Sequence, residues 1–248
     1  MPFEKERIGA DQWLPIWVRH QHLARFRFAA TFAPGKVVVD CASGDGLSSR
    51  MLAEAGAARV YGYDLSAEAV EHARRVNAHD NMQFEVASAM ELPLDDEAAD
   101  LFVSLETIEH LDAVDDYLGE VARVLRPDGE FLCSTPNRLV YSPGHTLESR
   151  PWNPFHVREY SPDEFQRVLG SFFGEVVLLG QSFRSKWRTA ALNRLGQLLP
   201  FDLTVRANQA SKIPRLAYDK VEHHAVMPLD GSRVPECLVA VCSKPRKQ

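Results

Sequence analysis

Short apolar runs and segments of helical period alternate along the middle of the chain. Apolar runs rich in β-branched residues predict seven strands, at Val37–Asp40, Val60–Tyr63, Gln83–Val86, Leu101–Ser104, Glu130–Ser134, Val176–Leu179 and Leu238–Cys242. Apolar residues recur at helical spacing between them, at Leu47–Ala55, Ala67–Ala78, Val114–Leu125 and Pro162–Leu169. This alternation predicts an α/β fold, a doubly wound, seven-stranded parallel sheet with helices on both faces.

Two helix boundaries are marked by their own residues. Pro127 cannot continue the third helix, and Gly129 supplies the tight turn into the next strand. The fourth helix starts at Ser161, a cap residue followed by Pro162 at the first helical position and Glu164 two residues later. These positions fix where two of the predicted helices begin or end.

Two segments fall outside the alternating pattern, within what we expect to be a single domain over residues 1–248. Residues 1–33 form an aromatic-rich lead-in, expected to be a helical cap. Residues 184–236 form an insertion, or lid, before the last strand. Trp13, Trp17 and Trp187 could line an apolar acceptor pocket, although aromatic residues on such helices more often belong to the core.

The insertion differs from the rest of the chain in charge. Residues 184–220 hold eight Lys or Arg residues and two acids, so they carry +6 while the remaining residues carry −12. Apolar residues recur at helical spacing there, at Trp187, Ala191, Leu192, Leu195, Leu198 and Leu199. With Arg188 and Arg194 off that stripe, the pattern predicts an amphipathic basic helix. Three roles stay open for it: packing on the core, covering an anionic substrate, or contacting an anionic membrane surface at its periphery.

Composition excludes several classes of protein. The chain has 248 residues, 45% of them hydrophobic, and a net charge of −6, as expected for a globular domain. No apolar run reaches the roughly 18 residues that a spanning helix needs, and the charged residues 1–7 do not resemble a signal peptide, so we expect a cytoplasmic protein. The four cysteines form no CxxC pair and lie in mostly apolar runs, which favours reduced, buried thiols.

A small-residue loop after the first strand is the first candidate binding site. Gly44 and Gly46 would let a ligand approach the backbone, and Asp64 ends the second strand where a carboxylate can accept bonds from ribose hydroxyls. The G-x-G-x-x-G pattern of dinucleotide loops is missing. Asp40 and Asp45 would repel a pyrophosphate, whereas a sulfonium and an ammonium group tolerate them.

These residues resemble class I S-adenosylmethionine-dependent methyltransferases, which have a Rossmann-like sheet. The resemblance covers roughly residues 36–182 and the last strand, and continues through the adenine-side motif Ser88–Pro93 and the stretch Glu120–Gly129. It departs from the family where Ala42 replaces a glycine and Ser88 an aspartate. The resemblance implies S-adenosylmethionine as cofactor and a cofactor site made by Asp40, Ala42, Gly44, Gly46, Asp64, Leu65, Ser88, Ala89, Met90 and Leu105.

A second cluster follows the fourth strand. Glu106, Glu109 and His110 stand at i, i+3 and i+4, so a single helical turn would place them on one face, toward the crevice beyond the strand ends. Such a cluster can equally be a solvated or hydrogen-bonded group. Together with His156 it resembles the metal-binding residues of small-RNA 2'-O-methyltransferases and ubiquinone-biosynthesis O-methyltransferases, which implies Mg²⁺ or Mn²⁺ on Glu106, Glu109, His110 and His156. Without metal, His110 or His156 is the candidate catalytic general base.

The acceptor of the methyl group is predicted less directly than the cofactor. Motif likeness to bacterial glycan-assembly methyltransferases implies a sugar hydroxyl, and the basic segment suggests a phosphorylated or lipid-linked sugar. A small aromatic or quinone acceptor, methylated with a histidine base, is the alternative. The acidic net charge argues against nucleic acid. Two further classes stay open, a dinucleotide oxidoreductase and a non-catalytic partner protein.

Overall fold

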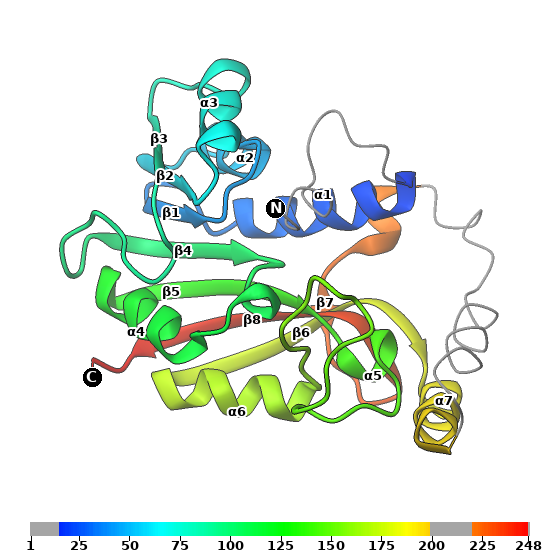
Figure 1. The fold of residues 1–248 in the computed structure, drawn as a ribbon. Helices are drawn as coiled ribbons and strands as arrows, with labels where there is room; N and C mark the ends of the chain where they lie inside the picture. Colours follow the sequence, from blue (N-terminus) through cyan, green and yellow to red (C-terminus); the bar gives the residue numbers. More distant parts are fainter. Residues whose placement is uncertain (1–14, 199–219, 248) are drawn as a thin grey trace.

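An eight-stranded sheet forms the centre of the molecule (Figure 1). The computed structural model describes residues 15–198 and 220–247. The strand order is β3-β2-β1-β4-β5-β8-β6-β7. The strands are β1 (Val37–Cys41), β2 (Arg59–Asp64), β3 (Met82–Val86), β4 (Ala99–Leu105), β5 (Leu125–Pro136), β6 (Phe173–Ser185), β7 (Met227–Pro228) and β8 (Arg233–Pro245).

The first five strands pair in parallel, while β8 runs antiparallel to both of its neighbours, β5 and β6. The chain first builds outward from β1 to β3 and then returns to place β4 on the other side of β1. The loops that leave β1 and β4 therefore diverge, and a crevice opens at the carboxyl ends of these strands.

Helices cover both faces of the sheet (Figure 1). One face packs against α1 and α2 through a core that includes Ala29, Val38 and Leu52, and the other packs against α4 and α6 through Tyr117, Phe131 and Phe165. The helices are α1 (Ile16–Ala30), α2 (Leu47–Glu54), α3 (Ala67–Val76), α4 (Val114–Val124), α5 (Arg138–Tyr141), α6 (Pro162–Phe172) and α7 (Lys186–Leu198), with the 3-10 turns η2 (Ile108–His110) and η4 (Val221–His224).

The predicted elements are confirmed, with extended ends. All seven predicted strands and all four predicted helices are present. The two helix boundaries are as expected: α4 ends three residues before Pro127, and Ser161 and Glu164 form a capping box at the start of α6. The turn expected at Gly129 is not present, because β5 already begins at Leu125 and contains Gly129. The count of seven strands was wrong, because the two-residue β7 pairs with β6 at the sheet edge. A strand of two residues has no period to detect. The expectation of a parallel sheet was wrong on the same side, where β8 runs antiparallel to β5 and β6.

The two flanking segments are partly described. The lead-in contains α1, but Trp13 and residues 1–14 lie outside the described residues, as does Leu199 with residues 199–219. The predicted insertion is narrower than 184–236, since β6 continues to Ser185 and β8 already begins at Arg233. The predicted basic helix is present as α7. All four cysteines are buried. Among the described residues, helices long and apolar enough to cross a membrane are absent.

Candidate active site

One cavity of about 800 Å³ lies at the carboxyl ends of the parallel strands. Its walls come from the loops that follow β1, β2, β3 and β4, and from α1, which contributes Trp17, Gln21, His22 and Arg25. The cavity lies where the strand order reverses, the usual place for a ligand in an open α/β sheet. The lead-in helix therefore forms a wall of the site.

The loop after β1 brings backbone close to this cavity. Gly44 has φ +56° and lines the cavity, and a Cβ built there would meet nothing within 4 Å. Its amide donates a hydrogen bond to Asp64 Oδ2, at 3.0 Å. Gly46 has φ +83°, but a Cβ on it would lie 2.6 Å from Phe84 Cζ. The first glycine thus leaves room for a ligand, and the second allows the loop to pack on β3.

Asp40 lies at the base of the loop. Its Oδ2 accepts hydrogen bonds of 2.6 Å from the hydroxyls of both Ser48 and Ser49, so it ties the end of β1 to the first turn of α2. Burial raises the pKa of Asp40 to about 6, although the two serine hydroxyls oppose the rise. Asp40 therefore shapes the loop as well as lining the cavity.

Asp64 organises the loop after β2. In addition to the Gly44 contact, its Oδ1 accepts a hydrogen bond from the Ser66 amide at 2.8 Å. Ser88 lies across the cavity in the loop after β3, where its hydroxyl accepts a bond from the Met90 amide. The carboxylate of Asp64 at the end of β2 suits the hydroxyls of a ribose, and the polar turn at Ser88 after β3 suits a base.

The predicted cofactor residues converge with one exception. The cavity is lined by Asp40, Ala42, Gly44, Asp64, Leu65, Ser88, Ala89, Met90 and Leu105. Gly46 is not part of the lining, because it faces Phe84 and Ala73. The open backbone at Gly44 and the buried carboxylate of Asp64 fit S-adenosylmethionine, whose adenosine needs close approach and whose ribose offers two hydroxyl donors.

The same cavity contains a group of metal-ligating residues. Glu109, His110 and His156 each offer one donor atom, and these atoms lie within 4.8 Å of one another. The backbone brings them together, because the Glu109 carbonyl accepts a hydrogen bond of 2.8 Å from the Val157 amide. The loop around residue 156 is thereby fixed against the turn η2.

Both imidazoles are oriented by an acceptor at Nδ1. His110 Nδ1 lies 3.0 Å from the Phe155 carbonyl oxygen, and His156 Nδ1 lies 2.7 Å from a carboxylate oxygen of Glu159. With protons on Nδ1, the lone pairs are on Nε2, as in metal-bound histidines supported by a carboxylate or a carbonyl. The side chain of Asn153 lies 2.9 Å from His156 Nε2 and donates to it, so it competes for that lone pair.

Glu159 was not predicted. It is buried and accepts a second hydrogen bond, of 2.7 Å, from the Ser142 hydroxyl. Its spacing of three residues from His156 was a signal that could have found it, because an acid near a candidate ligand histidine is a common supporting residue.

Glu106 does not join the metal group. It has φ +55° at the end of β4, so it precedes the 3-10 turn rather than sharing a helical turn with Glu109 and His110. Its carboxylate lies 3.5 Å from the guanidinium of Arg25 and accepts a hydrogen bond of 2.7 Å from Ser134. The sequence interpretation that placed Glu106 with Glu109 and His110 on one helical face was therefore wrong in its geometry.

The two neighbouring glutamates differ in their electrostatics. Burial raises the pKa of the Glu109 carboxyl well above its usual value, and the nearby charge of Glu106 adds to that rise. Burial is also the largest influence on Glu106 and acts in the same direction. The charge of Arg25, His22 and a hydrogen bond from Ser134 together outweigh it and hold the pKa of Glu106 below its usual value. A cation near Glu109 would offset the cost of keeping that carboxylate charged.

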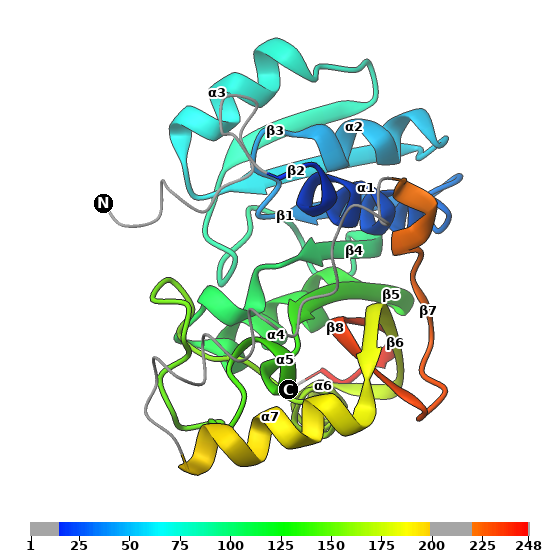
Figure 2. The ribbon, with the colours of Figure 1, turned by 90° about the vertical axis from the view of Figure 1, so that its right-hand side faces the viewer.

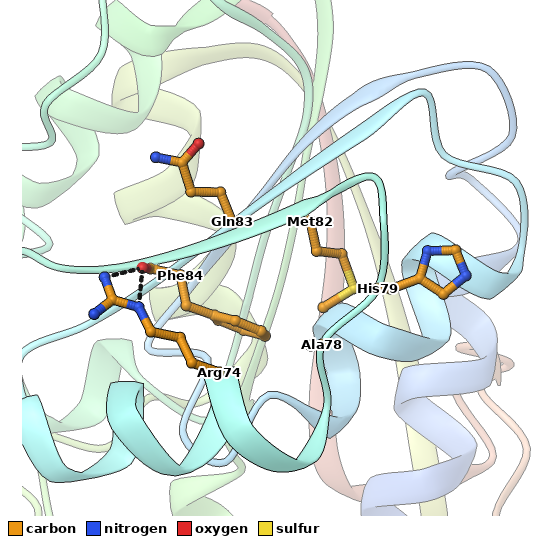
Figure 3. Close-up of a pocket in the computed structure, with 6 residues that line it drawn as sticks. All are labelled: Arg74, Ala78, His79, Met82, Gln83 and Phe84. Atoms are coloured by element: carbon orange, nitrogen blue, oxygen red, sulfur yellow. Dashed lines mark hydrogen bonds between the residues drawn. The ribbon is translucent and has the colours of Figure 1, made fainter.

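A second, smaller cavity of about 270 Å³ lies between the end of α3 and β3 (Figure 3). Arg74 donates from Nε and Nη2 to the Phe84 carbonyl oxygen across it, at 2.9 and 2.5 Å. None of the predicted site residues lines this cavity, so the chemistry of the described residues concentrates in the larger one.

Comparisons with known proteins agree with this site. The family model for a methyltransferase domain matches residues 39–133. The chain is 36% identical over 153 residues to a probable S-adenosylmethionine-dependent methyltransferase of Mycolicibacterium smegmatis, a match that covers 62% of this chain and 57% of that protein. It is 30% identical over 204 residues to a similarly described protein of Mycobacterium tuberculosis, covering 82% of this chain and 72% of that one.

More distant proteins share part of the sequence or the fold. A ubiquinone biosynthesis O-methyltransferase of a Chelativorans species is 28% identical over 160 residues, 60% of this chain and 63% of that protein. A solved S-adenosylmethionine-dependent methyltransferase from Thermotoga maritima, described as a possible histamine N-methyltransferase, has a TM-score of 0.62 at 19% identity and covers 92% of this chain and 91% of its own. The fold, the glycine loop and these relatives together show that the chain belongs to the S-adenosylmethionine-dependent methyltransferases.

Proposed function

We propose that the enzyme methylates a hydroxyl group with the help of a divalent cation held by Glu109, His110 and His156. The observation that carries this proposal is that these three donors meet in the cavity that the cofactor loop also lines. A methyl donor held near Gly44 and Asp64 would therefore share one space with the cation and the acceptor.

The donor set fits a divalent cation. Two imidazole nitrogens and one carboxylate suit Mn²⁺, and also Zn²⁺ or Fe²⁺, while Mg²⁺ prefers oxygen ligands. A bound cation would supply Lewis acidity, which favours the alkoxide of a hydroxyl that is a poor nucleophile at neutral pH. The protein's own part is to hold the histidines in one tautomer and orientation through Phe155 and Glu159.

Alignment is the second contribution of the chain. Methyl transfer is an in-line displacement at the sulfonium methyl, so the acceptor oxygen must face the methyl group on the side opposite to the sulfur. The wall made by Trp17 and Phe26 of α1 closes the cavity on one side and restricts the positions that an acceptor can take.

We infer that the acceptor is a hydroxyl of a sugar or glycan. Neighbouring hydroxyls of a sugar can chelate one cation, which matches a cation held by only three protein donors. The basic residues that follow β6 support a phosphorylated or lipid-linked form of this acceptor, because their charge complements an anion.

A second candidate is a small aromatic or quinone acceptor, methylated without metal. Two observations favour it: the apolar side chains of α1 in the cavity wall, and the likeness to a ubiquinone biosynthesis O-methyltransferase. In this mechanism His156 acts as the general base and Glu159 orients it, as a carboxylate does for the histidine of a catalytic dyad. Both candidates use His156, oriented by Glu159, and they differ in whether a cation is needed.

The test is a methyl-transfer assay with labelled S-adenosylmethionine against a panel of sugars, sugar phosphates and phenols. Each acceptor is assayed with Mn²⁺, with Mg²⁺, and after chelation. The proposal predicts turnover of a sugar that is lost on chelation and restored by one of the two ions. Turnover of a phenol that is unchanged by chelation, and lost in His156→Ala, would instead establish the second candidate.

A further inference from the structure

The helix α7 is docked by its polar and small residues. Asn193 Nδ2 donates to the Leu139 carbonyl oxygen at 2.7 Å, and Asn193 Oδ1 accepts from the Gly144 amide at 3.0 Å. A Cβ at Gly196 would overlap the carbonyl oxygen of Pro143, so the helix backbone approaches this loop as closely as glycine allows. Thr189, on the same side, is the one buried residue of the helix.

The opposite side of α7 carries its apolar residues outward. Trp187, Leu195 and Leu198 are 72, 39 and 80% exposed. With 100° between successive residues, these three and the exposed Ala191 fall within an arc of about 80° on one face. A helix of a globular protein normally turns such a stripe toward the core. In α7 the stripe faces away from it, at the periphery of the molecule (Figure 2).

Positive charge surrounds this stripe. Arg188 and Arg194 are exposed and flank it, each about 20° beyond one edge of the stripe, and α7 contains no acidic residue. The guanidinium of Arg188 lies 5.6 Å from the centre of the Trp187 ring. An apolar stripe with an aromatic residue and a basic border is the pattern of helices that lie in a membrane interface.

We propose that α7 docks the enzyme peripherally on an anionic lipid surface. Trp187, Leu195 and Leu198 enter the interface, and Arg188 and Arg194 contact the headgroups. Charge favours this occupant over a second copy of the chain, because a two-fold contact would bring the same cations of two helices together. The contact needs no spanning segment, since an interfacial helix binds by its buried apolar area and its charge.

The position of α7 connects this docking with the active-site cavity. The helix packs on α5, and Tyr141 at the end of α5 lines the large cavity. Docking would thus bring one wall of the cavity close to the lipid surface. If the proposed hydroxyl acceptor is correct, this arrangement suits an acceptor that is carried by a lipid.

The test is flotation of the full chain with vesicles of phosphatidylcholine alone and of equal parts phosphatidylcholine and phosphatidylglycerol. We expect binding to the anionic vesicles that weakens as salt is added. Arg188→Ala and Arg194→Ala should each weaken binding about fivefold. Trp187→Ala should weaken it by roughly tenfold or more. Arg75→Ala, an exposed arginine on the distant helix α3, is the charge-matched control and should bind as the wild type does.

A second measurement distinguishes a specific loss of vesicle binding from misfolding, and it does not depend on the proposed methyl transfer. S-adenosylhomocysteine binding, measured by calorimetry, should be unchanged in all three α7 variants, since none of these residues lines the cavity. Equal binding to neutral and anionic vesicles, or full binding by Arg188→Ala and Arg194→Ala, would overturn the proposal. So would a dimer that Trp187→Ala dissociates, or a Trp187 that acrylamide cannot quench without vesicles, because either would mean that protein covers the stripe.

Discussion

Replacing Arg25 with methionine tests how the wall of the site is held to the sheet. Arg25 is 2% exposed, and its guanidinium lies 2.5 Å from Gln181 Oε1, 3.0 Å from His22 Nδ1 and 3.5 Å from the Glu106 carboxylate. Methionine keeps the aliphatic stem of the side chain but is shorter by the guanidinium group and has no charge. The variant therefore keeps the apolar contacts of the stem and removes the cation that faces Glu106.

The size of the effect follows from the distance and the burial. At 3.5 Å, with an effective dielectric constant of about 20, the attraction between the two charges is about 5 kcal/mol. Breaking a buried ion pair by removing one partner costs about 3–5 kcal/mol, because the other charge stays buried without compensation. For a chain of this length, that loss lowers Tm by about 10 °C.

The effect should also depend on pH. In the wild type Arg25 holds the pKa of Glu106 below its usual value, so this pair stabilises the fold at neutral pH and the contribution is lost as pH falls through that pKa. In Arg25→Met, burial and the neighbouring Glu109 raise the pKa of Glu106. Protonation of Glu106 at low pH then removes the cost of burying its unpaired charge. The difference in unfolding free energy between the two proteins should therefore shrink as pH falls.

Urea denaturation of four proteins decides this prediction. Arg25→Met should lose the stability stated above, and Arg25→Met/Glu106→Gln should regain most of it, because neither charge remains. Arg50→Met is the control: its ion pair with Glu54 is exposed at both ends, so the variant should lose less than about 1 kcal/mol. An Arg25→Met protein as stable as the control, or a double variant no better than the single one, would refute the reasoning.

Two further predictions concern the cofactor loop. Gly46→Ala should lower the free energy of unfolding by about 1–3 kcal/mol, since its φ is +83° and its Cβ would overlap Phe84. Gly44→Val is strained as well, at φ +56°, but its side chain also enters the cavity, so it alone should weaken S-adenosylhomocysteine binding. Urea denaturation and calorimetry measure the two effects, and equal loss of binding in both variants would count against this assignment. Burial raises the pKa of Asp40 to about 6, so between about pH 4 and pH 6 the folded chain holds a proton that the unfolded chain has released. The contribution of Asp40 to the free energy of unfolding should therefore decline as the pH rises through this range. Asp40→Asn should abolish that part of the decline, and a pH profile of stability that is unchanged in the variant would contradict the assignment.

Much of the fold could be predicted from the sequence because its elements are local. The seven strands are short, mainly apolar runs between turns, and α4 and α6 carry their own stop and start residues, Pro127 and Ser161. The cofactor loop was predictable for the same reason, since Gly44 and Asp64 follow strands whose order fixes where they meet.

The site beyond the loop depended on contacts that no local pattern contains. Arg25 reaches Glu106 from a helix 81 residues earlier in the chain, and this contact separates Glu106 from Glu109. The positive φ of Glu106 likewise breaks the helical spacing that the sequence suggested. Glu159 and Val157 were close in sequence to His156, but only the structure shows that they fix it against Glu109 and orient its ring.

The most direct test of the account is a calorimetric titration of Mn²⁺ into the chelator-treated enzyme with S-adenosylhomocysteine bound. The account predicts one ion per chain in the wild type, none in Glu109→Gln or His156→Ala, and an affinity about 10 to 100 times weaker in Glu159→Gln. Glu106→Gln, which lies outside the donor group, should bind the ion as the wild type does. Absence of binding in the wild type, or loss of binding in Glu106→Gln with retention in His156→Ala, would contradict the proposed metal centre.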